Sequence, residues 1–161
     1  MADIEIVDVK KEKDEQVILG HAAFIKTVED LYEAVYSSVP GVQFGIAFSE
    51  ASGDRLIRTE GNNKELISKA ADLLMKLSAG HTFAIFFKNA YPINILNSVK
   101  ALPEVSRIYC ATGNPLKVVI LKDQQGNSVI GVIDGMSPLG VEDESKKKER
   151  KDLIRKLGYK L

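Results

Sequence analysis

The sequence of 161 residues contains one cysteine, two histidines and no tryptophan. With Cys110 alone, the chain cannot form an internal disulfide, and it lacks the clustered cysteines and histidines of a zinc site. Lysine plus arginine equals aspartate plus glutamate, at 22 each, so no excess charge draws the whole chain toward nucleic acid or a membrane. No apolar run approaches the roughly 20 residues that cross a bilayer, and the N-terminal residues do not resemble a signal peptide. These absences predict a cytoplasmic globular protein with one domain, residues 1–161, and no nucleic-acid or membrane partner.

Familiar nucleotide-binding and catalytic motifs are also missing. The sequence has no G-x-x-x-x-G-K-[ST] phosphate loop, no G-x-G-x-x-G fingerprint, no protein-kinase signature and no G-x-S-x-G elbow. A site for a nucleotide or a phosphoryl group would therefore need a different construction.

Hydrophobic periodicity predicts eight strands and four helices. Strands are expected at 2–9, 17–24, 44–48, 56–59, 83–87, 105–111, 116–121 and 129–133, with the first two paired. Helices are expected at 28–39, between Asn63 and Gly80, at about 92–102, and at about 145–157, the last anchored by Leu153, Ile154 and Leu157. The order β-β-α-β-β-α-β-α-β-β-β-α predicts an α+β fold with a single mixed sheet and helices mainly on one face.

Two strands carry further information. Phe83 to Phe87 is apolar throughout, which predicts a central strand without a solvent-facing side. In the strand 44–48, Gly45 and Ala47 alternate with large residues, so their face should lie close to a helix or a neighbouring subunit.

The segment Ala79–Asn97 is the leading candidate for a ligand site. It joins His81, the apolar strand and the polar run Lys88-Asn89-Ala90-Tyr91-Pro92-Ile93-Asn94. If Pro92 opens a helix, the amides of Ile93, Asn94 and Ile95 lack intrahelical partners and are available to a phosphate, with Lys88 adding positive charge. Asn89 and Tyr91 are candidates to orient a nucleoside. The alternative is that these residues only cap and turn the chain.

Both histidines, His21 and His81, directly follow a glycine. A histidine beside glycine suits a general base, a phosphate contact or a phosphoryl-accepting nucleophile, because glycine permits close approach of a ligand. The alternative is a structural histidine. The structural interpretation is favoured for His21, and the structural and functional interpretations are equally favoured for His81.

Carboxylates elsewhere in the chain could complete such a site. Asp134 follows the last strand and is a candidate catalytic base or magnesium ligand, or else an Asx-turn. Glu142 and Asp143 are possible magnesium ligands, although acids before a helix more often interact with its dipole. Glu50 lies in a polar loop that belongs to the site or merely turns a hairpin.

Several long segments carry a family resemblance. They are GHAAFIKTVEDLYEAVYSSVPGVQFGIAFSEASG (20–53), AGHTFAIFFKNAYPINILN (79–97), PEVSRIYCATGNP (103–115), GVIDGMSPLGVEDE (131–144) and RKDLIRKLGYKL (150–161). On these segments the chain resembles the small archaeal and bacterial adenosine-specific kinase family, with Ala23 where GHAHF-type relatives carry a second histidine.

The resemblance implies binding of adenosine and AMP, transfer of a phosphoryl group from ATP to adenosine, a compact α+β fold and assembly into trimers or hexamers. The site residues come from position and chemistry. In this hypothesis His81, Asp134 and Lys88 are catalytic, and Asn89, Tyr91, Ile93, Asn94, Ile95, His21 and Glu50 bind nucleoside or phosphate. His81 contacts the transferred group or carries it as phosphohistidine, and Mg²⁺ assists ATP. The alternative function is a non-catalytic adenosine or AMP sensor.

Overall fold

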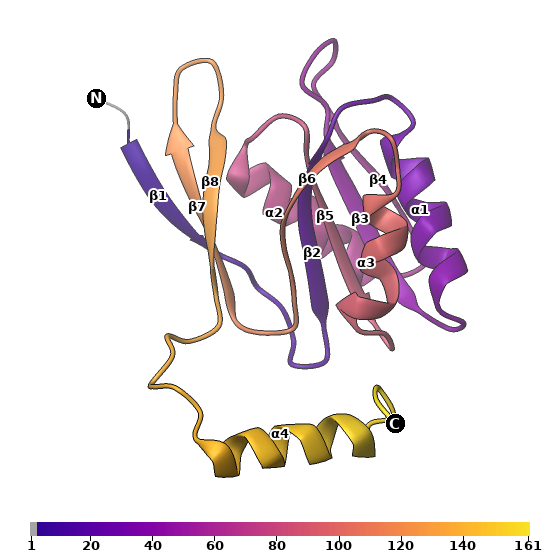
Figure 1. The fold of residues 1–161 in the computed structure, drawn as a ribbon. Coiled ribbons are helices and arrows are strands. Elements are labelled where there is room, and N and C mark those ends of the chain that lie inside the picture. The colour runs from indigo at the N-terminus through magenta and orange to yellow at the C-terminus, as the bar shows by residue number, and fades with distance from the viewer. Residues whose placement is uncertain (1–2) are drawn as a thin grey trace.

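The computed structural model describes residues 3–161 and contains four helices and eight strands in the expected order (Figure 1). The strands are β1 (Asp3–Asp8), β2 (Gln16–Ala22), β3 (Gln43–Ser49), β4 (Ile57–Gly61), β5 (Thr82–Lys88), β6 (Val105–Thr112), β7 (Leu116–Lys122) and β8 (Ser128–Asp134). The helices are α1 (Thr27–Ser38), α2 (Lys64–Leu77), α3 (Pro92–Lys100) and α4 (Glu144–Lys156). The α+β class is confirmed. No helix within residues 3–161 has the length and apolar character needed to span a membrane.

The larger sheet has five strands in the order β4-β3-β5-β2-β6. β5 occupies the centre, and every residue from Thr82 to Phe87 is buried, as its unbroken apolar sequence predicts. Antiparallel pairing with β3 on one side and β2 on the other leaves no solvent-exposed edge along β5.

The prediction of a single mixed sheet is wrong in two respects. β1, β7 and β8 form a separate three-stranded sheet, and all pairs in both sheets are antiparallel. β1 pairs with β7 and not with β2, because both edges of β2 are occupied by β5 and β6. β2 is also almost wholly buried, as a strand between two partners should be, whereas every residue of β1 except Val7 is exposed.

Helices cover both faces of the larger sheet, so the expectation of helices mainly on one face holds only for α1 and α3. These two helices pack against one face through Leu31, Val35, Ile95 and Val99. α2 covers the opposite face and shares its apolar cluster with the inner face of the small sheet.

Gly45 explains how α2 approaches β3 so closely. A Cβ atom at this position would lie 2.0 Å from the backbone nitrogen of Ile67 in α2. The small-residue face predicted from Gly45 and Ala47 therefore receives a helix of the same chain.

The last helix stands apart from the body (Figure 1). None of the residues of α4 is buried, and Leu153 and Leu157 are more than half exposed. The prediction that Leu153, Ile154 and Leu157 anchor this helix to the core of the same chain is wrong.

Candidate functional site: a histidine pair at the end of the large sheet

Two histidines meet at one end of the five-stranded sheet. His21 is near the end of β2, and His81 immediately precedes β5. Because β2 and β5 are antiparallel and His21 is opposite Thr82, the two rings come together edge to face, with 5.7 Å between their centroids. We call this the two-histidine site.

The backbone of His81 is tied to both neighbouring strands. Its N–H donates to the carbonyl of Ser49 at 2.8 Å, and its carbonyl accepts from the N–H of Ala22 at 2.9 Å. These bonds hold His81 at φ +61°, a left-handed conformation that is unusual for a residue with a side chain. The ring also stacks on Phe48, with 6.0 Å between centroids. Arg55, Ser78 and Asn89 share this backbone conformation, but of the four only His81 combines it with a second histidine at ring contact.

The glycine before His81 does not have the predicted role. Glycine often ends a helix in a left-handed conformation, but here α2 ends with Ser78 as its C-cap, with φ +50° and its N–H bonded to the carbonyl of Leu74. Gly80 instead allows close packing, because a Cβ atom there would lie 2.9 Å from the Cβ of Ala51.

His21 is held by the adjacent strand β6. Its Nδ1 lies 2.8 Å from the hydroxyl oxygen of Ser106, which fixes the ring orientation. Burial, together with the nearby His81 and Arg107, lowers the pKa of His21 below its usual range. His21 is therefore neutral near pH 7 and retains a nitrogen lone pair for hydrogen bonding or proton transfer.

A carboxylate and a guanidinium complete the surroundings of His81. Arg58 of β4 lies 3.0 Å from Glu50 between Nη2 and Oε1, and its Nη1 donates to the carbonyl of Ile25 at 3.0 Å. A pocket of about 280 Å³ is bounded by His81, Phe48, Phe24, Glu50 and Arg58, among others. The site thus combines a cation, a carboxylate and aromatic surfaces.

A larger depression of about 930 Å³ adjoins this pocket, and Glu50 and Ala51 line both. Its other walls come from the loop before β4, the end of α2 and the turn between β7 and β8. The two hollows therefore share part of one wall, which includes the carboxylate of Glu50.

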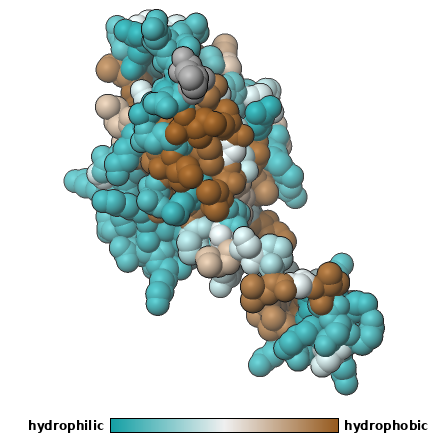
Figure 2. Space-filling model, turned by 90° about the vertical axis from the view of Figure 1, so that its left-hand side faces the viewer, coloured by the Kyte–Doolittle hydropathy of each residue, from teal (hydrophilic) through white to brown (hydrophobic). Residues whose placement is uncertain are grey.

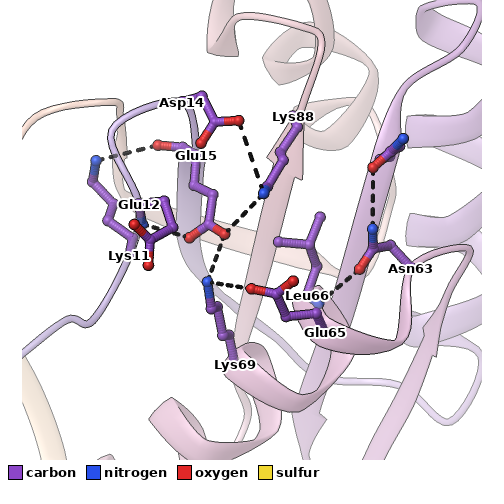
Figure 3. A network of polar contacts seen from close by, with 10 residues as sticks. Lys11, Glu12, Asp14, Glu15, Asn63, Glu65, Leu66, Lys69 and Lys88 are labelled. Carbon is purple, nitrogen blue, oxygen red and sulfur yellow. Dashed lines mark hydrogen bonds and ion pairs between the residues drawn. The ribbon is translucent and has the colours of Figure 1, made fainter.

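Lys88 lies at the opposite end of β5 from His81. The two positions are seven residues apart along the chain, which corresponds to roughly 23 Å at about 3.3 Å per residue of extended strand. Lys88 Nζ is 3.5 Å from Glu15 Oε1 and 3.8 Å from Asp14 Oδ2, while Lys69 Nζ is 2.6 Å from the same Glu15 oxygen (Figure 3). The structure does not bring Lys88 and His81 to one ligand.

Glu15 is the centre of this ion network. Burial acts to raise its pKa, but hydrogen bonds from Lys69 and from the amide of Glu12 outweigh burial and hold the pKa below its usual range. The Glu15 side chain is fully buried, so the paired lysines compensate a charge removed from water. This arrangement is a sufficient structural reason for Lys88.

The residues that follow Lys88 mostly satisfy one another. Asn94 Oδ1 accepts from the N–H of Tyr91 at 2.9 Å, and the N–H of Asn94 donates to the carbonyl of Tyr91. Asn89 turns the chain with φ +64°, and the side chain of Ile95 is buried in the core. Tyr91 and Ile93 are exposed. This cluster corresponds to the capping and turning alternative, and it too lies far from the two-histidine site.

The candidate magnesium ligands are dispersed and individually engaged. Asp134 Oδ1 accepts from the Thr112 hydroxyl at 2.8 Å, Glu142 pairs with Arg150, and Asp143 caps α4 by accepting from the N–H of Lys146. Within residues 3–161, no three histidine, cysteine, aspartate or glutamate residues are grouped to hold a metal ion. These carboxylates therefore do not fit a shared magnesium site.

Four residues at the site were not predicted from the sequence: Phe48, Arg58, Ser106 and Arg107. The sequence predicts the strands that contain these residues, but it does not predict the strand registers that bring them beside the histidines. Ser106 and Arg107 lie in the segment PEVSRIYCATGNP, where polar side chains at the beginning of a strand were the available signal.

Fold and geometry together define an antiparallel α+β protein with two histidines side by side at one end of its larger sheet. The model of the family described as "Adenosine specific kinase" matches residues 7–160, and the chain belongs to this family. The family description indicates kinase chemistry related to adenosine.

A solved structure shares this fold over the whole chain. It is the crystal structure of the PH1918 protein from Pyrococcus horikoshii OT3, whose sequence is 44% identical to this chain and whose structure matches this one with a TM-score of 0.96. The alignment covers 100% of this chain and 99% of that protein. No curated protein matches the sequence.

Proposed function

We propose that this protein transfers a phosphoryl group from ATP to adenosine at the two-histidine site. The observation that carries this proposal is the edge-to-face contact of His21 and His81 beside the Glu50–Arg58 pair. The family match supplies the substrate class, and the two adjoining hollows supply room for two substrates.

The chemistry of the pocket walls supports the following placement of the two substrates. Adenosine occupies the smaller pocket, where the exposed ring of Phe24 offers an aromatic surface to a purine. ATP occupies the larger depression, whose wall includes Glu50, with its γ-phosphate directed toward the smaller pocket, where Arg58 lies. Arg58 neutralises charge on the phosphates, because a guanidinium binds such oxygens in a bidentate manner.

The transfer forms one phosphorus–oxygen bond and breaks another. The ribose hydroxyl oxygen of adenosine attacks the γ-phosphorus, ADP leaves, and the hydroxyl proton passes to Glu50 or to neutral His21. In this direct route His81 contacts the transferred phosphoryl group. In the alternative route a ring nitrogen of His81 attacks the γ-phosphorus and forms a phosphorus–nitrogen bond as ADP leaves, and the ribose hydroxyl oxygen then attacks that phosphorus, breaks the phosphorus–nitrogen bond and gives AMP. In both routes catalysis comes mainly from positioning and charge neutralisation.

The sequence-based roles of Lys88, Asp134 and Mg²⁺ stay predictions. Lys88 and the Tyr91–Ile95 segment lie at the far end of β5, and Asp134 is bonded to Thr112. A catalytic role for them would require a second ligand site, so variants at these positions separate the two hypotheses.

The test is AMP formation from adenosine, ATP and magnesium by the purified full chain. His81→Asn is the sharpest variant, because asparagine tolerates the left-handed backbone while removing the imidazole. We expect His81→Asn and Arg58→Gln to reduce the rate at least 100-fold, and Lys88→Gln and Asp134→Asn to retain most of it. Phosphate on wild-type protein that is stable to alkali and labile to acid, and absent from His81→Asn, would identify the phosphohistidine route.

Two outcomes would overturn the proposal. If His81→Asn forms AMP at the wild-type rate, the two-histidine site is not catalytic. If wild-type protein binds adenosine in calorimetry but forms no AMP, the alternative of an adenosine or AMP sensor is correct.

A further inference from the structure

Polar chemistry is unevenly distributed over the surface of the protein. The side of the body formed by the small sheet carries an apolar patch, with Ile4 and Ile6 more than half exposed (Figure 2). At the histidine end of the large sheet, by contrast, two imidazole rings lie close to a carboxylate and a guanidinium. There the hydrogen bonds of His21 decide which of its two ring nitrogens is available to a ligand.

Ser106 reaches His21 because β6 contains a β-bulge at this point. The register of β2 with β6 passes from His21 opposite Arg107 to Ala22 opposite Val105, so Ser106 is an additional residue on β6. In a regular antiparallel ladder Ser106 would be opposite Ala22, and its side chain would point to the other face of the sheet from His21. A bulge redirects a side chain in this way, and bulges are common next to active sites.

Two contacts join the side chain of Ser106 to His21. The Ser106 hydroxyl donates to the backbone carbonyl of His21 at 3.2 Å, and the same hydroxyl oxygen lies 2.8 Å from Nδ1 of the ring. A serine hydroxyl has a single proton, and a carbonyl can only accept. With that proton directed to the carbonyl, the contact with the ring requires Nδ1 to carry a proton and donate it to the Ser106 oxygen.

The opposite tautomer satisfies fewer groups. If Nδ1 were the acceptor, the Ser106 proton would no longer serve the His21 carbonyl, and the proton on Nε2 would have no hydrogen-bond partner from residues 3–161. The Nδ1–H tautomer keeps both contacts. Because the hydrogen bond made by one imidazole nitrogen sets the state of the other, Nε2 is left with its lone pair.

The surroundings of His21 keep its ring neutral, as a choice between tautomers requires. Burial lowers the pKa of His21, and His81 next to β5 and Arg107 on β6 lower it further. The ring of His21 also contacts that of His81, which lines the smaller pocket. A substrate that reaches His81 therefore comes close to a neutral imidazole with one bare nitrogen.

We propose that Ser106 is a positioning residue that holds His21 in the Nδ1–H tautomer, so that Nε2 accepts from the ribose 5′-hydroxyl of adenosine. This proposal rests on the phosphoryl transfer proposed above, and it assigns to His21 the proton for which Glu50 is the other candidate. As the 5′-oxygen forms its bond to the γ-phosphorus and the bond to ADP breaks, the hydroxyl proton moves to Nε2. The resulting imidazolium still donates from Nδ1 to Ser106, and it then releases the Nε2 proton to water.

The first test measures the tautomer directly, by nitrogen–proton correlation NMR of isotopically labelled histidine rings. The chain has only two histidines, so His21→Gln assigns the signals. At pH 8 the wild-type protein should show a protonated Nδ1 and a bare Nε2 at His21. Ser106→Ala should shift His21 toward the Nε2–H form, and Ser106→Thr should restore the wild-type pattern because it keeps the hydroxyl. Ser98→Ala is the matched control, since it removes a hydroxyl that bonds to Ser38 at 3.0 Å and leaves the contacts of His21 intact.

The second test measures the acceptor role of Nε2. Adenosine should move the Nε2 signal of His21, whereas 5′-deoxyadenosine, which lacks the attacking hydroxyl, should bind and move it much less. In the AMP assay Ser106→Ala should lower kcat about tenfold with KM nearly unchanged, because the tautomer affects proton transfer and not substrate binding. Ser106→Thr should recover most of that loss.

Three results would overturn the proposal. They are a wild-type His21 that carries its proton on Nε2, a tautomer that Ser106→Ala leaves unchanged, and equal movement of the Nε2 signal with the two nucleosides. All three are measured without turnover. A protein with the expected tautomer and the expected response to adenosine that nevertheless forms no AMP would refute the phosphoryl transfer and still support the positioning of His21 by Ser106.

Discussion

The rings of His21 and His81 meet edge to face across 5.7 Å, although the first belongs to an early strand and the second follows α2. The contact depends on the antiparallel register of β2 and β5 and on the left-handed backbone of His81. The backbone conformation of His81 and the surroundings of His21 each lead to a separate prediction.

The conformation of His81 predicts an unusual order of stability among its variants. A side chain at φ +61° costs about 1–2 kcal/mol, which glycine avoids. His81→Gly should therefore be more stable than His81→Ala by about 1 kcal/mol, measured by urea denaturation. Both variants should lose AMP formation. An alanine variant as stable as the glycine variant would show that the backbone relaxes at this position.

The lowered pKa of His21 predicts a loss of stability in mild acid. Because the native state binds this proton less readily than the unfolded chain, the contribution of His21 is complete above about pH 6.5 and is lost as the pH falls through its folded pKa. Melting temperatures of wild-type protein and His21→Gln between pH 8 and pH 5 provide the measurement. The wild type should lose more than the variant below pH 6.5, and parallel curves would contradict the assignment.

Glu104 predicts the opposite trend with pH. Both of its carboxylate oxygens are buried without a hydrogen-bond partner, and burial together with nearby Asp30 raises the pKa of this group. Glu104 therefore holds its proton up to a higher pH in the native state than in the unfolded chain. Its contribution lowers the free energy of unfolding as the pH rises above about 4.5 and through the folded pKa. Glu104→Gln should stabilise the protein by about 1 kcal/mol at pH 8 and by little at pH 4. Thermal unfolding at the two values tests this difference.

The ion network around Glu15 predicts that its lysines act on stability. Removing Lys69, which is 2.6 Å from the buried carboxylate, should cost about 2–4 kcal/mol. Removing the more distant Lys88 should cost about 1 kcal/mol or less. Chemical denaturation of Lys69→Met and Lys88→Met gives both values. A Lys88→Met variant with normal stability but no AMP formation would instead support the catalytic role predicted from the sequence.

Gly45 predicts a severe packing defect. In Gly45→Ala the new methyl group would meet the backbone of α2, which cannot move aside as a flexible side chain can, so we expect a loss of about 3 kcal/mol or more. Gly131→Ala is the control, because nothing lies within 4 Å of a Cβ atom there. Equal effects of the two substitutions on the unfolding midpoint would contradict the close approach of α2.

Local sequence patterns predicted the elements well because the physics behind them is local. The apolar run Phe83–Phe87 identified the central strand, and Gly45 indicated a close contact. The asparagine pair before α2 predicts a cap from Asn62 or Asn63, and Asn63 provides it by accepting from the N–H of Leu66. Strand partners were harder to predict. β1 and β2 are neighbours in the chain, yet the choice between partners depends on which other strands compete for β2.

The candidate site shows the same limit. Proximity in the chain placed His81 and Lys88 in one segment, but an extended strand carries them to opposite ends of the sheet. Arg58 and Ser106 join His81 and His21 only through the registers of β4 with β3 and of β6 with β2. No local pattern encodes those registers. The roles of His21, His81 and Glu50 remain predictions that the geometry makes more specific.

The pairing of the first strands also governs how the chain folds during synthesis. Within the described residues, β1 pairs with β7 alone, and β2 needs β6 for one of its two edges. Neither strand can therefore complete its pairing until residues from position 105 onward have been synthesised. Such long-range pairing slows folding, because loop closure must precede the contacts that reward it. The N-terminal half therefore cannot complete its sheet while the ribosome is still adding β6 and β7. Until then β2 lacks one of its two partner strands, and a chain truncated before residue 116 leaves β1 without a partner.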